Sequence, residues 1–310
     1  MTDLQVRKMR FGFADHDVPF LWNEANPAFS CMANAVSFLA VAFEKMIGAM
    51  IPEAMPLITD PEIAEEAQAF VRQEGQHSMA HRQHVKGLIK SHPALQETLD
   101  EVIAAFDDLT ANTSLAYRLA YTADLEATFT PVFKLMLDND DTLFAPGDDR
   151  VASLFLWHFV EEVEHRSSAL IIYDHVVADP MYRVRVAPSI FRHVMAVVRM
   201  AAEGFNKHIA VEERKVDALS TFVTHRYKRE FLRRLPFGHG VDNGPVENAF
   251  AHLPAREQWR AVVGIVRSQM PNHRPAHEKL PALAAEWFDR YDNGYDVTNW
   301  YTAGKREADV

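Results

Sequence analysis

The chain has 310 residues, of which 48% are hydrophobic and 24% charged, a composition typical of a soluble globular protein with an ample core. Its net charge of −11 argues against an electrostatic nucleic-acid binder, and its single cysteine, Cys31, excludes an internal disulfide and fits a reducing cytoplasm. The first ten residues are not expected to be a signal peptide, because no apolar core follows them, and no uncharged apolar run is expected to approach the length of a membrane span. Residues 186–204 come closest, but they include Arg192, Arg199 and Glu203.

Glycine is scarce, with 12 residues, and no alternating strand pattern persists, so the sequence predicts an all-α fold. An irregular N-terminal arm is expected over 1–29. Helices are then predicted, in chain order, over 30–50, 61–91, 93–110, 112–137 and 149–178. The short third helix crosses from one helical hairpin to the next, which is typical of ferritin-like bundles.

The sequence therefore predicts a ferritin-like four-helix bundle over 30–180. Asp179-Pro180 ends the last bundle helix, because the residue before a proline disfavours the helical region. Residues 181–310 are expected to form additional helices that pack on the bundle within a single domain. Their predicted ranges are 186–210, 216–235, 246–270 and 279–292.

Two short patterns on the predicted bundle helices are the most informative motifs. They are Glu74-Gly-Gln-His77 and Glu162-Val-Glu-His165. Each places a carboxylate and an imidazole three residues apart, on one face of a helix. One Glu-x-x-His on each of two helices, together with a single Glu on each of two others, is the arrangement with which four-helix bundles bind two metal ions.

Hairpin geometry identifies the first single glutamate. The midpoint of Glu44 and Glu74 is residue 59, inside a predicted turn in which Thr59 or Asp60 caps the next helix and Pro61 occupies its first position. Residues equidistant from the turn of an antiparallel hairpin lie at the same height. Glu44, in an otherwise apolar run, is therefore expected to face Glu74.

The second hairpin repeats this relation. The midpoint of Glu126 and Glu162 is residue 144, inside the turn-rich segment 138–148. Asp124 is a rival to Glu126, but it would point to another helix face. Two hairpins that each bring a glutamate level with a Glu-x-x-His would make a six-ligand box suited to iron, manganese or zinc.

His158 extends the set to seven, because His158, Glu162 and His165 share one helix face at positions i, i+4 and i+7. His81 occupies a similar place after His77. For His81, a role in packing or in holding a ligand by a hydrogen bond is favoured over binding the metal itself. Glu161 is a possible acceptor for a ligand's hydrogen bond. The alternative for each of these side chains is a packed or exposed polar group. For Glu164, which points away from this face, an exposed and solvated side chain is the favoured interpretation.

The sequence also resembles two known groups of proteins. The run from Trp157 to His165, with Gln73, Glu74, His77 and His81 and with Leu125-Glu126, resembles the bacterial family of predicted metal-dependent hydrolases. The ligand order is similar to that of the ferritin-like di-iron arylamine N-oxygenases, in which a histidine precedes the last Glu-x-x-His by four residues, as His158 does here. This order is Glu44, Glu74, His77, Glu126, His158, Glu162 and His165.

The second resemblance implies two iron ions and an O2-activating oxygenase or oxidase that acts on a small molecule in the cytoplasm. Manganese or zinc is an alternative metal. The expected partners are O2 and the substrate, with an electron donor and a homodimer partner left open. A two-metal hydrolase and a non-enzymatic metal-binding helical protein are the alternative functions.

Overall fold

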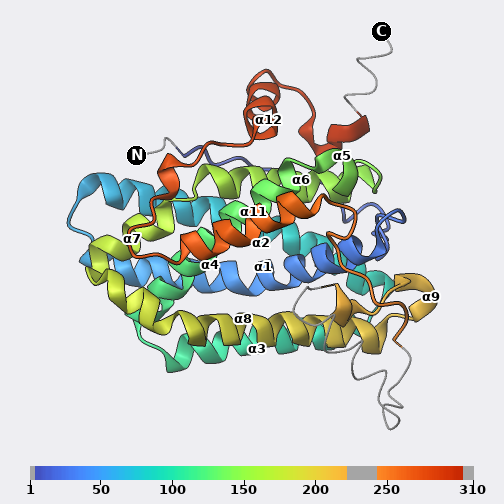
Figure 1. Ribbon diagram of the computed structural model, residues 1–310, viewed down its shortest axis with the longest axis horizontal. Helices are drawn as coiled ribbons and strands as arrows, with labels where there is room; N and C mark the ends of the chain where they lie inside the picture. Colours follow the sequence, from blue (N-terminus) through green and yellow to red (C-terminus); the bar gives the residue numbers. More distant parts are fainter. Residues whose placement is uncertain (1–3, 222–242, 303–310) are drawn as a thin grey trace.

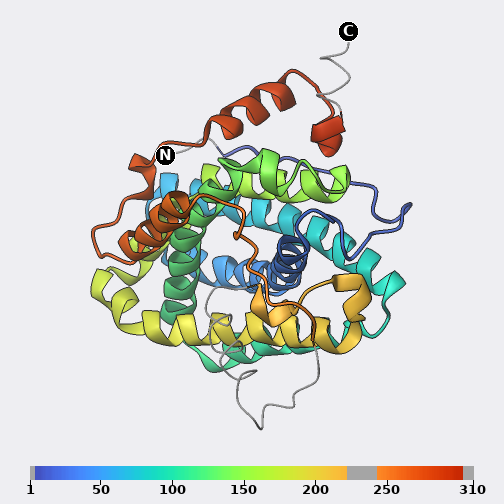
Figure 2. The same cartoon turned by 45° about the vertical axis from the view of Figure 1, so that its right-hand side comes forward.

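The computed structural model describes residues 4–221 and 243–302, and this part of the chain contains helices and no strands. The all-α prediction is confirmed. Figures 1 and 2 show long helices that enclose a common interior, with shorter helices on the outside. The helices are α1 (Pro27–Ala54), α2 (Pro61–Ser91), α3 (Leu95–Asn112), α4 (Leu115–Leu137), α5 (Asp140–Leu143), α6 (Asp149–Glu164), α7 (Ser168–Val177), α8 (Pro180–His208), α9 (Val211–Arg214), α11 (Ala255–Ser268) and α12 (Ala282–Asp292).

Local capping explains where the long helices begin. The Asp60 carboxylate accepts hydrogen bonds from the amides of Glu62 and Ile63, and Pro61 takes the first position of α2. Asp148 caps α6 in the same way, through the amides of Arg150 and Val151. Both caps lie in the turns predicted from sequence, so α1 and α2 form one hairpin and α4 and α6 form the other.

The N-terminal arm contains no helix among residues 4–26, and α1 begins at Pro27, three residues before the predicted start. The arm is part of the core rather than an appendage. Its aromatic residues Phe11, Phe13, Phe20 and Trp22 are each buried. Its burial explains why this segment is ordered without forming a helix.

The most apolar long helix is α1, which is uncharged from residue 27 to residue 43. The expectation that no such run approaches the length of a membrane span is therefore wrong. Within the described part of the chain, the stretch Pro27–Leu57 alone has the length and hydropathy of a span, but 67% of its most apolar window is buried inside the molecule. Burial of this extent is typical of a helix in the core of a globular protein.

The predicted continuous helix over 149–178 is interrupted, since α6 ends at Glu164 and α7 begins at Ser168. Arg166 explains the break. Its guanidinium donates hydrogen bonds to the carbonyls of Val163 and Pro275, at 2.6 and 2.9 Å. The Arg166 side chain thus donates to a carbonyl at the end of α6 that a backbone amide would bond if the helix continued.

The additional C-terminal helices differ from their predicted bounds. Helix α8 begins at Pro180 rather than near residue 186, because Asp179 caps it through the amides of Met181 and Tyr182. The helix predicted over 246–270 starts only at Ala255. Of the helix predicted over 216–235, the structure describes a 3-10 turn at Ala218–Ser220, and residues 222–235 lie outside the described part.

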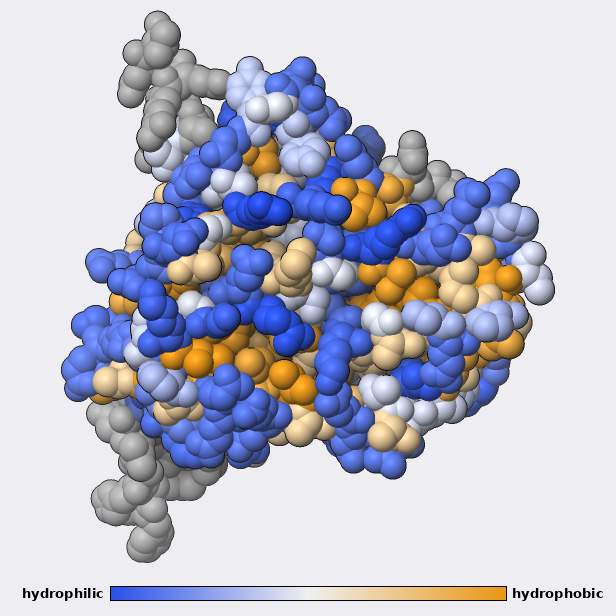
Figure 3. Space-filling view, turned by 180° about the vertical axis from the view of Figure 1, so that it is seen from behind, coloured by the Kyte–Doolittle hydropathy of each residue, from blue (hydrophilic) through white to orange (hydrophobic). Residues whose placement is uncertain are grey.

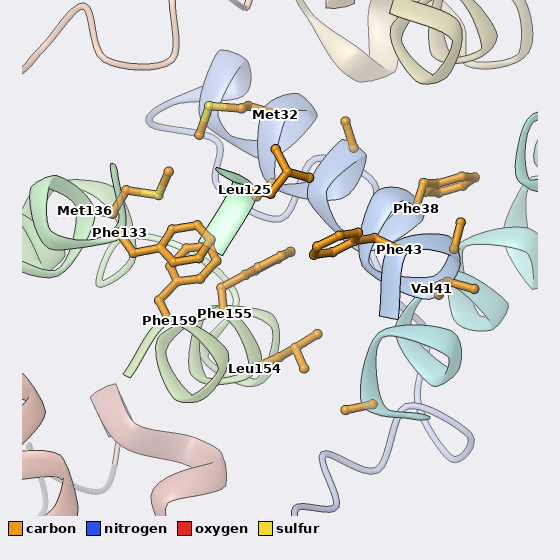
Figure 4. Packing of buried hydrophobic residues seen from close by; sticks show 14 of the residues in the cluster. Met32, Phe38, Val41, Phe43, Leu125, Phe133, Met136, Leu154, Phe155 and Phe159 are labelled. Atoms are coloured by element: carbon orange, nitrogen blue, oxygen red, sulfur yellow. The ribbon is translucent and has the colours of Figure 1, made fainter. Parts of the chain in front are cut away.

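Aromatic and aliphatic side chains fill the interior between the helices (Figure 4). Phe133 of α4 and Phe159 of α6 stack with ring centroids 4.0 Å apart, and Phe155 packs beside Phe159. On the outer side, Gly204 of α8 lies directly against Thr98 of α3. Seen from behind, the surface is a mosaic in which hydrophilic bands separate hydrophobic areas (Figure 3).

Candidate metal centre

The seven side chains proposed from sequence as ligands converge in the interior between the long helices. They come from α1, α2, α4, α6 and the residue that follows α6, and each is at most 4% exposed. Two pairs of helices supply them as the hairpin argument predicts. The residues are Glu44 on α1, Glu74 and His77 on α2, Glu126 on α4, His158 and Glu162 on α6, and His165 at its C-cap.

One group of donors surrounds the His165 ring. Its Nε2 lies 3.2 Å from Glu74 Oε1, 3.4 Å from Glu126 Oε2 and 3.3 Å from Glu162 Oε2. All four residues offer a ligand atom within 4.8 Å of the others. Three carboxylates and one imidazole thus face one small volume.

A second group surrounds His77 and His158. His77 Nδ1 lies 3.5 Å from Glu162 Oε1, and His158 Nε2 lies 2.8 Å from the same oxygen and 3.6 Å from Glu44 Oε1. Glu44, Glu74 and His77 also each offer a ligand atom within 4.8 Å of the other two. Glu74 and Glu162 therefore belong to both groups, as expected of carboxylates that bridge two ions.

The orphaned polar atoms of this cluster show that the residues fit metal ions. Eight buried side-chain atoms of the cluster have no hydrogen-bond partner. Scattered through a protein interior, such atoms would be costly, because each loses its hydration without compensation. Here such atoms gather at one place and turn toward one another. They include Glu44 Oε2, both oxygens of Glu74 and of Glu126, Glu162 Oε2, His77 Nδ1 and His165 Nε2.

Each imidazole uses its other nitrogen to bind an outer residue. His77 Nε2 lies 2.9 Å from Glu161 Oε2, His165 Nδ1 lies 3.0 Å from Gln73 Oε1, and His158 Nδ1 lies 2.7 Å from His81 Nε2. Such outer hydrogen bonds fix the ring orientation and the tautomer of a ligating histidine. The role of Glu161 as an acceptor agrees with the sequence hypothesis.

A buried arginine joins two of these outer contacts. Arg7 Nη1 donates to Glu161 and to Glu164, each at 2.9 Å, and Gln73 Nε2 donates to Glu164 at 2.8 Å. The interpretation of Glu164 as a solvated side chain is wrong, because this side chain is only 12% exposed. Arg7 draws it inward, from a segment far away in sequence.

A chain of hydrogen bonds runs outward from His158. His81 Nδ1 and His84 Nδ1 both lie 2.9 Å from the Ser37 hydroxyl. If His158 Nε2 ligates a metal, its Nδ1 must carry the proton and donate to His81. His81 then donates to Ser37, and Ser37 donates to His84, so ligation at one end fixes the direction of the whole chain.

Burial and neighbouring charges shift the acid–base properties of the cluster. Burial, reinforced by the charge of Glu74 on Glu44 and of Glu162 on Glu126, raises the pKa of Glu44 and Glu126 well above the ordinary value. Burial also acts to raise the pKa of Glu162, but contacts with His165, His158 and His77 outweigh it and hold this pKa well below the usual range. The site therefore needs positive charge to keep all its carboxylates ionised.

Other polar candidates lie apart from the cluster. Asp124 forms a buried ion pair with Arg183 at 2.8 Å, which removes it as a rival to Glu126. Tyr121 bonds to His193 through its hydroxyl, and Tyr173 donates to the carbonyl of Asp179, so both support packing.

Sequence reasoning assigned no part in the site to Arg7, Ser37 and His84. All three contact residues that are distant in sequence, so no local residue spacing predicts their role. The outer residues that helix spacing did indicate are His81 and Glu161, which contact His158 and His77.

Comparison with protein families gives a match over most of the chain. The family described as "Predicted metal-dependent hydrolase" matches residues 5–238, which include all seven clustered residues. No curated protein and no solved structure is significantly similar to the chain.

Proposed function

This chain belongs to the family of predicted metal-dependent hydrolases, and we propose that it is a two-metal hydrolase whose ions are held between the helical hairpins. The convergence of orphaned carboxylate and imidazole atoms in a buried cluster is the observation that carries this proposal. We also propose that 30–180 is a ferritin-like four-helix bundle, with 1–29 and 181–310 packed on it in a single domain.

The grouping of donors suggests how two ions would be shared. Glu126 and His165 would serve one position, and Glu44, His77 and His158 the other, with Glu74 and Glu162 bridging both. When bound by these residues, two ions would supply Lewis-acid chemistry: a lowered pKa for a water and a polarised carbonyl or phosphoryl oxygen of a substrate. Iron, manganese and zinc all accept this mixture of nitrogen and oxygen ligands.

The protein's own residues would prepare the reaction by holding geometry and excluding water. Glu161 accepts a hydrogen bond from His77 Nε2, which leaves His77 Nδ1 directed at the site. Gln73 accepts from His165 Nδ1 and so leaves His165 Nε2 directed at the site. Aromatic rings enclose the imidazoles: Trp157 lies edge-on to His77 at 5.0 Å. A dry surrounding strengthens every charge interaction at the centre.

A second candidate function is O2 activation at a di-iron centre. It is favoured by the donor arrangement, because a single Glu on each of two helices and a Glu-x-x-His on each of the others is the pattern of di-iron and di-manganese carboxylate proteins. A reaction of this kind would need O2, a small-molecule substrate and a source of electrons.

Metal analysis tests the proposed centre. We expect about two ions per chain in the purified protein, and loss of most of that metal in Glu162→Gln, since this residue would bridge both ions. Glu66→Gln is the matched control, because Glu66, on α2, is likewise a buried glutamate but accepts a hydrogen bond from Ser168 outside the cluster. Equal metal content in the two variants would contradict the assignment.

Turnover then separates the candidate reactions. Ester or phosphoester hydrolysis that follows the content of zinc or manganese, with no O2 consumption by the ferrous protein, supports the hydrolase. Rapid O2 consumption by the ferrous form, with a new near-ultraviolet band and no hydrolysis, would instead favour the oxygenase. Metal binding without either reaction would indicate a structural metal protein.

A further inference from the structure

Helix α11 packs on the bundle through its small residues. Ala261 and Ser268 are buried, and a Cβ atom added at Gly264 would lie 2.6 Å from Pro131 Cβ of α4. These positions, at i, i+3 and i+7, form one helix face. Figures 1 and 2 both show α11 on the outside of the molecule beside α4.

Hydrogen bonds hold this helix at both ends. Asn139 Nδ2 donates to Glu257 Oε2 at 2.8 Å near its start, and Gln269 Nε2 donates to Thr128 Oγ1 at 3.0 Å just beyond its end. The helix therefore presents the opposite face to the surroundings in a fixed orientation.

That opposite face carries large apolar side chains. Trp259 is 67% exposed, Val262 47%, Val266 56% and Met270 48%. Their spacing of three, four and four residues makes a continuous stripe that runs along the helix and ends at Met270, just beyond its last residue. An ordinary surface helix buries its large apolar residues, whereas α11 buries small ones and leaves a contiguous apolar stripe in water, which marks an interaction surface.

A row of arginines follows one edge of this stripe. Arg256, Arg260 and Arg267 are exposed, and none of them forms an ion pair within the part of the chain that the structure describes. The chain as a whole carries a net charge of −11, so this local positive charge stands out against an acidic protein.

We infer that α11 docks this protein on an anionic lipid surface. An apolar stripe with an exposed tryptophan, lying parallel to the surface and edged by arginines, matches the boundary between acyl chains and phosphate headgroups. A second copy of the chain fits less well. In a two-fold interface the same patch meets itself, and the exposed side chains of α11 offer no carboxylate to pair with the arginines.

The test is co-sedimentation of the whole protein with vesicles of phosphatidylcholine mixed with phosphatidylglycerol. We expect binding to these vesicles and little binding to phosphatidylcholine alone. Replacing all three arginines by glutamine should weaken binding on the order of a hundredfold, and Trp259→Ser about tenfold. Tryptophan fluorescence gives an independent readout, because the other four tryptophans are buried: Trp22, Trp157, Trp287 and Trp300.

Phe191→Ser is the matched control, because Phe191 of α8 is a similarly exposed aromatic residue, at 61%, outside this stripe. It should bind vesicles as the unaltered protein does, and circular dichroism should show equal helix content in all variants. The inference is overturned if the unaltered protein does not bind anionic vesicles, or if the α11 variants bind them with the same affinity as the unaltered protein. It is also overturned if Trp259→Ser dissociates a dimer while no form binds lipid.

Discussion

At the scale of single residues, the cluster depends on groups that do not face its centre. His81 accepts from His158 when that histidine ligates a metal, and Ser37 and His84 continue the chain. Because a ligand's outer hydrogen bond sets its orientation and basicity, His81 is a positioning residue for the proposed metal site.

We expect His81→Leu to weaken metal binding by roughly ten- to a hundredfold, since His158 would lose the acceptor for its Nδ1 proton. Competition with a chromophoric chelator measures the change in affinity. Ser37→Ala leaves the His81–His158 contact in place, so its effect should be smaller. Equal affinities for His81→Leu and the unaltered protein would show that this contact does not position His158.

His84 makes stability depend on pH. Burial lowers the pKa of His84 from 6.5 to about 3, so the unfolded chain takes up this proton at a higher pH than the folded protein does. The stabilisation from neutral His84 is thus complete above pH 6.5 and is lost as the pH falls toward 3. Over that window it amounts to at most about 4 kcal/mol.

His84→Gln should therefore lessen the fall in the free energy of unfolding between pH 6.5 and pH 3. Urea titrations at a series of pH values, compared between the variant and the unaltered protein, measure this difference. His252→Gln, at an exposed histidine, is the control. Parallel curves for His84→Gln and the unaltered protein would refute the linkage.

The sequence predicted which residues converge better than it predicted what surrounds them. Glu44 and Glu126 follow from equal distances to a turn, which is a local property of a helical hairpin. Ser37 and Arg7 act on residues 44 and 154 positions away, and no spacing rule connects such positions. Their roles become visible only when the helices are packed.

At the scale of the helices, close approach depends on glycines at particular crossings. Gly204 of α8 has no room for a side chain, because an added Cβ would overlap Thr98 of α3, including its Cβ. Gly48 of α1 has open space around it. The same substitution should therefore have opposite effects at these two positions.

Gly204→Ala should destabilise the fold by about 1–3 kcal/mol, since α3 and α8 must separate. Gly48→Ala should instead stabilise it by roughly 0.5–1 kcal/mol, through the higher helix propensity of alanine. Chemical denaturation of both variants gives the two values. Equal effects would mean that the α3–α8 contact adjusts without cost.

The break between α6 and α7 shows why the predicted helix over 149–178 was too long. Residues 165–168 contain no glycine or proline, so nothing in the local sequence indicates an end. The stop comes from Arg166, whose guanidinium reaches the carbonyls of Pro275 and Glu278. A tertiary contact from the C-terminal segment thus overrides a local preference for helix.

At the scale of the whole molecule, Arg7 connects three distant segments. It pairs with Glu161 and Glu164 at α6, and its Cζ lies 4.6 Å from the centre of the Phe288 ring on α12. The N-terminal arm, helix α6 and a C-terminal helix therefore meet at one buried cation. Removing that charge leaves two acidic groups with little compensation.

Arg7→Gln should cost about 3 kcal/mol of stability and weaken metal retention, because Glu161 then holds His77 less firmly. Thermal unfolding and metal analysis measure the two effects. Arg10→Gln, at an exposed arginine of the same arm, should change neither. If the two variants behave alike, the arm does not support the centre.

The third imidazole, His158, makes the two proposed metal positions unequal. One position would have the unshared ligands Glu44, His77 and His158, all on continuous helices, and the other would have Glu126 and His165, the latter at the end of α6. Ions should therefore load in sequence, first at the position with two imidazoles. Between the two steps the protein would pass through a singly loaded form, and a titration with metal should resolve two affinities rather than one.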